Sequence, residues 1–81
     1  MTLLSACESE DKERDIPVSE VPSSIVNIIQ NTLPGIALNE AEVKTKDGAT
    51  VYELEGKLID GKEYDIDITE SGTIIKIELD D

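Results

Sequence analysis

The sequence predicts an α+β fold, in which one N-terminal helix packs on one face of a four-stranded antiparallel meander sheet. Two observations predict this fold. Apolar residues between positions 21 and 33 recur at the three- and four-residue spacing of a helix face, and the chain after residue 37 alternates apolar and polar residues between glycine turns. The first sixteen residues lack both patterns. We therefore expect a flexible acidic leader over residues 1–16 and one folded domain over residues 17–81.

The helix is expected to begin after Ser19, a favourable N-cap residue, and to end at Pro34-Gly35. Pro22 would then lie in the first turn, where its missing N–H costs nothing. Because the helix is rich in β-branched residues, we expect it to form only by packing on an apolar surface. Its predicted apolar face consists of Val21, Ile25, Ile28, Ile29 and Leu33.

Strands are expected over residues 38–46, 49–58, 62–69 and 73–79. The turns between them decide which side chains share a face, because a one-residue shift exchanges the two faces of a strand. A two-residue turn at Asp47-Gly48, a three-residue loop over residues 59–61 and a turn around Ser71-Gly72 agree on one buried face. That face is predicted to contain Val43, Tyr52, Leu54, Leu58, Tyr64, Ile66, Ile68, Ile75, Ile77 and Leu79.

The same registers predict an acidic outer face, where like charges oppose one another at a cost in stability. Such a face has two interpretations: a docking surface for a basic protein or a cation, or a solvated surface that keeps the domain soluble. The predicted rows are Glu40, Glu55, Asp65, Glu78, then Glu42, Glu53, Asp67, Lys76, and finally Lys44, Val51, Thr69, Ile74. The candidate partner-binding residues are Glu40, Glu42, Glu53, Glu55, Asp65, Asp67, Glu78, Val51 and Ile74.

Composition excludes several functions. Seven basic and nineteen acidic residues give a net charge of -12, which excludes electrostatic attraction to nucleic acid or anionic lipid. The sequence has no histidine, and we expect its carboxylates to lie open, with no pocket to raise one pKa above another. We therefore predict a protein without enzymatic activity, cofactor or dedicated metal site. A calcium-responsive acidic sheet module of the cell envelope is the alternative to protein binding.

The segment Leu4-Ser5-Ala6-Cys7 resembles the lipobox of bacterial lipoproteins, and a charged run follows it directly. In that context Cys7 would be the lipidated residue and the only link to a membrane. A signal peptide also needs a basic and an apolar region before the cysteine, and six residues precede it here. Either the start is truncated or the match arises by chance, and the printed chain could not be lipidated by that route.

The chain between residues 16 and 79 contains a series of short motifs: Val21-Pro22, Leu33-Pro34-Gly35, Tyr52-Glu53-Leu54, the acidic strand from Glu63 to Ile68, and Ser71-Gly72. Together these motifs resemble the pattern of the PepSY and PepSY-like family. The resemblance implies an exported module, periplasmic or at the cell surface, that binds and restrains a peptidase, as in relatives similar to the repeat of β-lactamase-inhibitory protein. It also implies two repeats in many relatives. One repeat is present here, so both a monomer and a homodimer are open.

Overall fold

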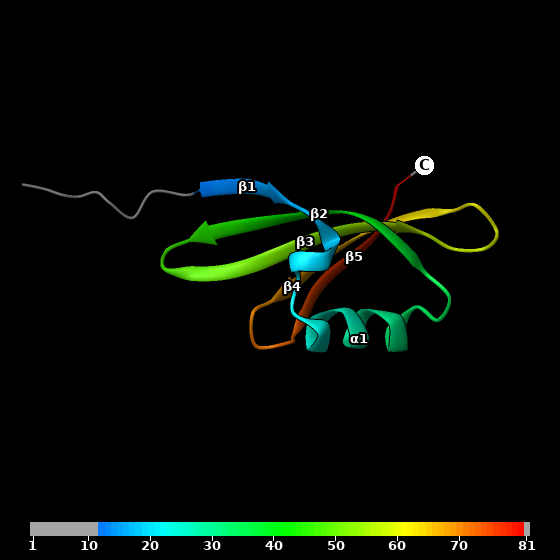
Figure 1. The fold of residues 1–81 in the computed structure, drawn as a ribbon, viewed down its shortest axis with the longest axis horizontal. Coiled ribbons are helices and arrows are strands. Elements are labelled where there is room, and N and C mark those ends of the chain that lie inside the picture. The colour runs from blue at the N-terminus through cyan, green and yellow to red at the C-terminus, as the bar shows by residue number, and fades with distance from the viewer. Residues whose placement is uncertain (1–11, 81) are drawn as a thin grey trace, which may run out of the picture.

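The computed structural model describes residues 12–80. Within this range the five strands form one antiparallel sheet in the order β1-β2-β3-β4-β5, and the helix α1 lies on one face of it (Figure 1). The opposite face carries no helix in the described part of the chain. The elements are β1 (Lys12–Ile16), a 3-10 helix η2 (Val18–Glu20), α1 (Ser23–Thr32), β2 (Ala37–Lys46), β3 (Ala49–Lys57), β4 (Glu63–Thr69) and β5 (Ile74–Asp80).

The predicted four-stranded sheet is wrong, although the α+β class holds. The additional strand is β1, which lies in the segment predicted as the end of the leader and pairs antiparallel with β2, Ile16 opposite Ala41. All but one of its residues are charged and exposed. An edge strand of this kind is held by backbone hydrogen bonds, which do not require an apolar face. The alternation that marks a strand in a sequence is therefore missing from it.

The helix α1 begins later than predicted. Val18–Glu20 forms a 3-10 turn, Val21 is extended, and Pro22 is the N-cap residue rather than part of the first turn. The Pro22 carbonyl accepts the amide of Ile25 at 3.0 Å, which starts the helix without a side-chain cap. The predicted apolar face does pack on the sheet, because Val21, Ile25 and Ile29 are buried.

The core lies between α1 and the two strands β3 and β4. Leu54, Ile66 and Ile68 have no exposed surface, and they belong to one cluster with Ile25 and Ile29. Apolar burial of this kind is the main favourable term in folding, at ~1.5 to 3 kcal/mol for each large aliphatic side chain. The cluster also contains Val21, Ile36 and Ala41, while Val43, Tyr52, Leu58 and Tyr64 are half-buried.

The first two hairpin turns have the predicted geometry. Asp47 and Gly48 have φ values of 52° and 80°, the left-handed pair that a two-residue hairpin turn requires. In the loop over residues 59–61, Gly61 has φ 89° and the amide of Lys62 donates to Asp60 Oδ1 at 3.0 Å. These turns fix the register that places Glu53 and Glu55 on the face away from α1.

The last hairpin departs from the prediction. Ile66 pairs with Ile77 as predicted, but Ile68 pairs with Ile74 instead of Ile75, so β5 contains one extra residue, a β-bulge. The loop before it is tight: the amide of Thr69 donates to the Thr73 carbonyl at 2.8 Å, and Gly72 has φ 99°. This loop shifts the pairing between β4 and β5 by one residue from the predicted one, and the bulge restores the predicted pairing for the rest of β5.

Three residues predicted as core are exposed instead. Ile75, Ile77 and Leu79 are 58%, 41% and 46% exposed. Ile77 and Leu79 pair with Ile66 and Tyr64 and so share the face that α1 covers, but the short helix leaves this part of the sheet edge open. The prediction assumed that one helix would cover all four predicted strands, which ten residues of helix do not do.

Candidate functional site: an acidic sheet face

The sheet face without a helix carries carboxylates in register across the strands. Glu55 lies directly opposite Glu40 on one side and Asp65 on the other, and Asp65 lies opposite Glu78. In the next row Glu53 lies between Glu42 and Asp67. We call this surface the acidic face, and its residues are Asp15, Glu40, Glu42, Glu53, Glu55, Asp65, Asp67 and Glu78.

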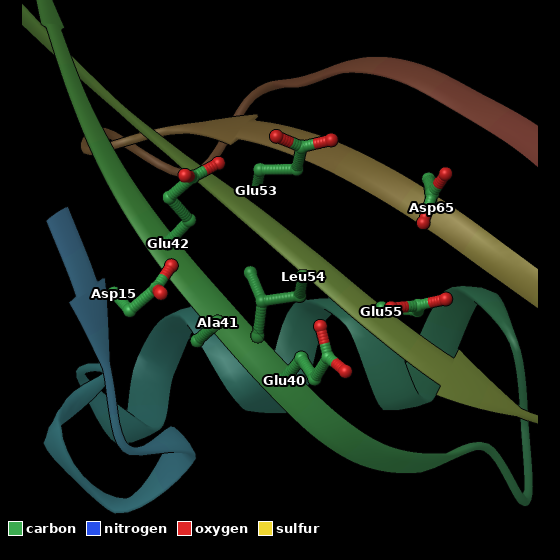
Figure 2. Close-up of a pocket in the computed structure, with 8 residues that line it drawn as sticks. All are labelled: Asp15, Glu40, Ala41, Glu42, Glu53, Leu54, Glu55 and Asp65. Carbon is green, nitrogen blue, oxygen red and sulfur yellow. The ribbon is translucent and has the colours of Figure 1, made fainter. Parts of the chain in front are cut away.

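The acidic face is hollowed at its centre. Figure 2 shows the carboxylates of β1 to β4 on the side of the sheet away from α1. They surround a shallow depression of about 170 Å³. None of the described residues that line it is basic, and it is smaller than the ~300 Å³ typical of small-molecule pockets. Its size and charge suit one or two cationic side chains. The lining residues are Asp15, Glu40, Ala41, Glu42, Glu53, Leu54, Glu55 and Asp65.

Glu55 is the most perturbed carboxyl of this face. Partial burial, together with the negative charges of Glu40 and Asp65, raises the pKa of Glu55 to about 7. The pKa of Asp65 is also raised, by partial burial and by the charge of Asp80. The sequence led us to expect no pocket that would raise one carboxyl pKa above another, but partial burial on the paired strands, together with repulsion between these groups, raises the pKa of Glu55 and of Asp65.

Glu42 and Glu53 interact directly in the neighbouring row. Partial burial and a hydrogen bond with Glu53 raise the pKa of Glu42, whereas the Lys44 ammonium lowers the pKa of Glu53. Lys44 Nζ lies 2.9 Å from Glu53 Oε1, and this hydrogen bond raises the pKa of Lys44 in turn. Lys44 therefore compensates Glu53, and Lys76 lies opposite Asp67 in the same row, whereas Glu42 lies between Asp15 and Glu53.

The predicted candidate residues do not all lie on this face. The seven acidic ones do, and Val51 lies beside them, opposite Lys44 and Thr69. Ile74 does not, because the bulge in β5 turns it toward the core, where it packs against the buried cluster. The third predicted row therefore ends at Thr69. Whether any of these residues binds a partner stays a prediction.

Sequence reasoning missed Asp15, which β1 brings opposite Glu42. The sequence signal for this residue was weak. Glu13 and Asp15 alternate with Arg14 and Ile16, as residues of a strand do, but they belong to a run of charged residues that is also typical of a solvated segment.

Three carboxylates lie close together at one end of the sheet. Oxygens of Glu55, Glu63 and Asp80 lie within 4.8 Å of one another. This cluster shares only Glu55 with the calcium row expected from the sequence. Lys57 Nζ, 3.7 Å from Glu63, already compensates part of its charge.

No family model, no curated protein and no solved structure matches the chain. The PepSY resemblance thus stays a prediction, and Cys7 lies outside the residues that the structure describes. Within residues 12–80, no helix has the length and hydrophobicity that a membrane span requires.

Proposed function

We propose that this chain is a non-catalytic binding module that docks a basic protein surface on its acidic face. The single observation that carries the proposal is the direct pairing of carboxylates across strands, above all Glu40–Glu55–Asp65. Like charges in this position destabilise a sheet. A cationic partner would remove that penalty, because it supplies the positive charge that this row of carboxylates lacks.

The shape of the face supports protein binding over catalysis. The hollow is open and shallow, whereas enzymes bury the reacting groups to separate their pKa values and exclude water. Glu55 has the raised pKa of an acid catalyst, but the charges beside it are carboxylates, which repel anionic transition states. The resemblance to the PepSY family adds the finer proposal of an exported module that restrains a peptidase.

The test uses a cationic probe and a charge-matched control. Binding of a hexa-arginine peptide to the full chain is followed by NMR shifts, with the double variant Glu55→Lys/Asp65→Lys against Glu20→Lys/Glu70→Lys. Both variants gain the same charge, but Glu20 lies in η2 and Glu70 in the β4–β5 loop, both exposed. We expect the first to weaken binding by roughly tenfold or more and the second by far less.

Equal weakening by both variants would mean that the peptide senses only net charge, and the acidic face would lose its role. In that case the two variants should also capture the same proteins from an envelope extract. If the proposal holds, the wild type and the control variant should capture a partner that Glu55→Lys/Asp65→Lys does not capture.

A calcium-responsive module is the second candidate, and the converging oxygens of Glu55, Glu63 and Asp80 favour it. Calcium prefers clustered carboxylate oxygens. The two candidates differ at Glu63, which lies on the same side of the sheet as the acidic face but does not line the hollow. Calorimetry with calcium should give a saturable heat that Glu63→Gln abolishes if this candidate holds, whereas that variant should leave the binding of hexa-arginine nearly unchanged.

A further inference from the structure

The two edges of the sheet expose different chemistry. At the β1 edge the exposed side chains are charged, which discourages pairing with another strand. At the β5 edge, Ile75, Ile77 and Leu79 expose between 41% and 58% of their surface. An edge strand also presents backbone N–H and C=O groups to a neighbour. In the described part of the chain, β5 is therefore the edge that suits a further strand.

We propose that two copies of this chain pair through antiparallel β5 strands and form a dimer with one continuous sheet. The two-fold axis of such a dimer is perpendicular to the sheet, so opposing residues lie on the same face. With the axis at Ile77, the middle residue of Ile74–Asp80, Ile77 faces its own counterpart. Ile75 then faces Leu79, and Lys76 faces Glu78, of the second copy.

Charge selects this register among the alternatives. With the axis at Ile77, two pairs of opposite charge form across the interface, one on each side of the axis. In the single chain Lys76 Nζ already lies 3.3 Å from Glu78 Oε1, so both groups stand on the outer face where the second copy would meet them. An axis at Lys76 or at Glu78 would instead oppose two like charges.

The β1 edge offers no comparable register. An axis at Arg14, its middle residue, would oppose two arginines and place Glu13 against Asp15. The dimer is compatible with the proposed function, because a perpendicular axis leaves the acidic faces of both copies on the same side of the sheet, with Glu78 at their common border.

The test exploits the exchange of charges across the two-fold axis. In Lys76→Glu, each pair across the interface would consist of two glutamates, and in Glu78→Lys it would consist of two lysines. Each variant alone should therefore dimerise at least roughly tenfold more weakly than the wild type. An equimolar mixture restores opposite charges at both pairs and should form a heterodimer. Sedimentation equilibrium of the full chain, with reductant present to keep Cys7 from cross-linking, measures all of these.

Lys12→Glu on the β1 edge is the matched control, since it makes the same charge change and should leave dimerisation unaltered. Ile77→Lys places two lysines on the axis and should abolish the dimer. Circular dichroism checks that each variant is folded, and mixing gives an answer even if one of them is less stable. A monomeric wild type, a mixture that stays monomeric, or an open series of larger oligomers would each overturn the proposal.

Discussion

Glu55 lies between two other carboxyls, Glu40 and Asp65, and this position gives folding an unusual dependence on pH. Its pKa is about 7 in the folded protein and 4.5 when unperturbed, so the native state binds the proton more tightly than the unfolded chain does. The resulting stability is fully present below about pH 4.5 and is lost as the pH rises through about 7. The raised pKa values of Glu42 and Asp65 act in the same direction.

We therefore expect the free energy of unfolding to be higher at about pH 5.5 than at about pH 8, by roughly 1 to 2 kcal/mol once solvent screening is allowed for. The lowered pKa of Glu53 changes the stability in the opposite direction, but only at pH values below the ordinary pKa of a glutamate. Urea unfolding at the two pH values measures the difference. Glu55→Gln should be more stable than the wild type at about pH 8 and should flatten the profile, whereas Glu70→Gln in an exposed loop should do neither.

The sequence was sufficient to predict that Glu40, Glu55 and Asp65 lie opposite one another on neighbouring strands. Because the turns at Asp47-Gly48 and Gly61 have few allowed geometries, they fixed which residues oppose Glu53 and Glu55, and the structure has the same pairs. The pKa of Glu55 could not be predicted in the same way. It depends on how far the twisted strands bury each carboxyl, which the order of residues does not specify.

Among the elements, β1 is the one whose contribution is least visible in the sequence, and a truncation measures it. A chain starting at Lys12 keeps β1, and one starting at Pro17 removes it and leaves the β2 edge unpaired. We expect the shorter chain to lose roughly 1 to 3 kcal/mol of stability, because Ile16 no longer packs on the core and the ladder with β2 is gone. Equal melting temperatures for the two chains would show that β1 adds nothing.

Amide hydrogen exchange locates the same effect. The amides of β2 between Ala41 and Thr45 should exchange faster in the shorter chain, and those of β4 should change little. The reason that β1 escaped prediction is general to edge strands: with a neighbour on one side and almost no core contact, such a strand needs no apolar alternation. The bulge in β5 was missed because it depends on how the loop before it closes.

For the molecule as a whole, the charge of -12 predicts that salt stabilises the fold. Raising the ionic strength from 0.01 to 0.1 M shortens the screening length from about 30 to about 10 Å, which weakens the repulsion among the carboxylates of the sheet. We expect the melting temperature to rise by several degrees over this range, measured at a low protein concentration where the chain is monomeric.

The control is the same titration on Glu55→Lys/Asp65→Lys, which should respond less because the crowded rows are partly neutralised. A melting temperature that falls with salt would imply that attractive ion pairs, such as Lys44–Glu53, outweigh the repulsion. Salt should act in the opposite direction on the binding of hexa-arginine, so folding and docking can be distinguished in one set of solutions.

The extra residue of β5 also determines how insertions and deletions would act. Beyond it the strand points Ile77 and Leu79 to the side of α1 and Lys76 and Glu78 to the other side. Losing Ile75 would remove the bulge and leave a regular strand, because Ile74 would still pair with Ile68 and Ile77 with Ile66. A residue gained between Lys76 and Ile77 would instead move Ile77 to the other side of the sheet and turn Glu78 toward the face that α1 covers. The segment should therefore tolerate the loss of a residue at Ile75 better than the gain of one beyond it.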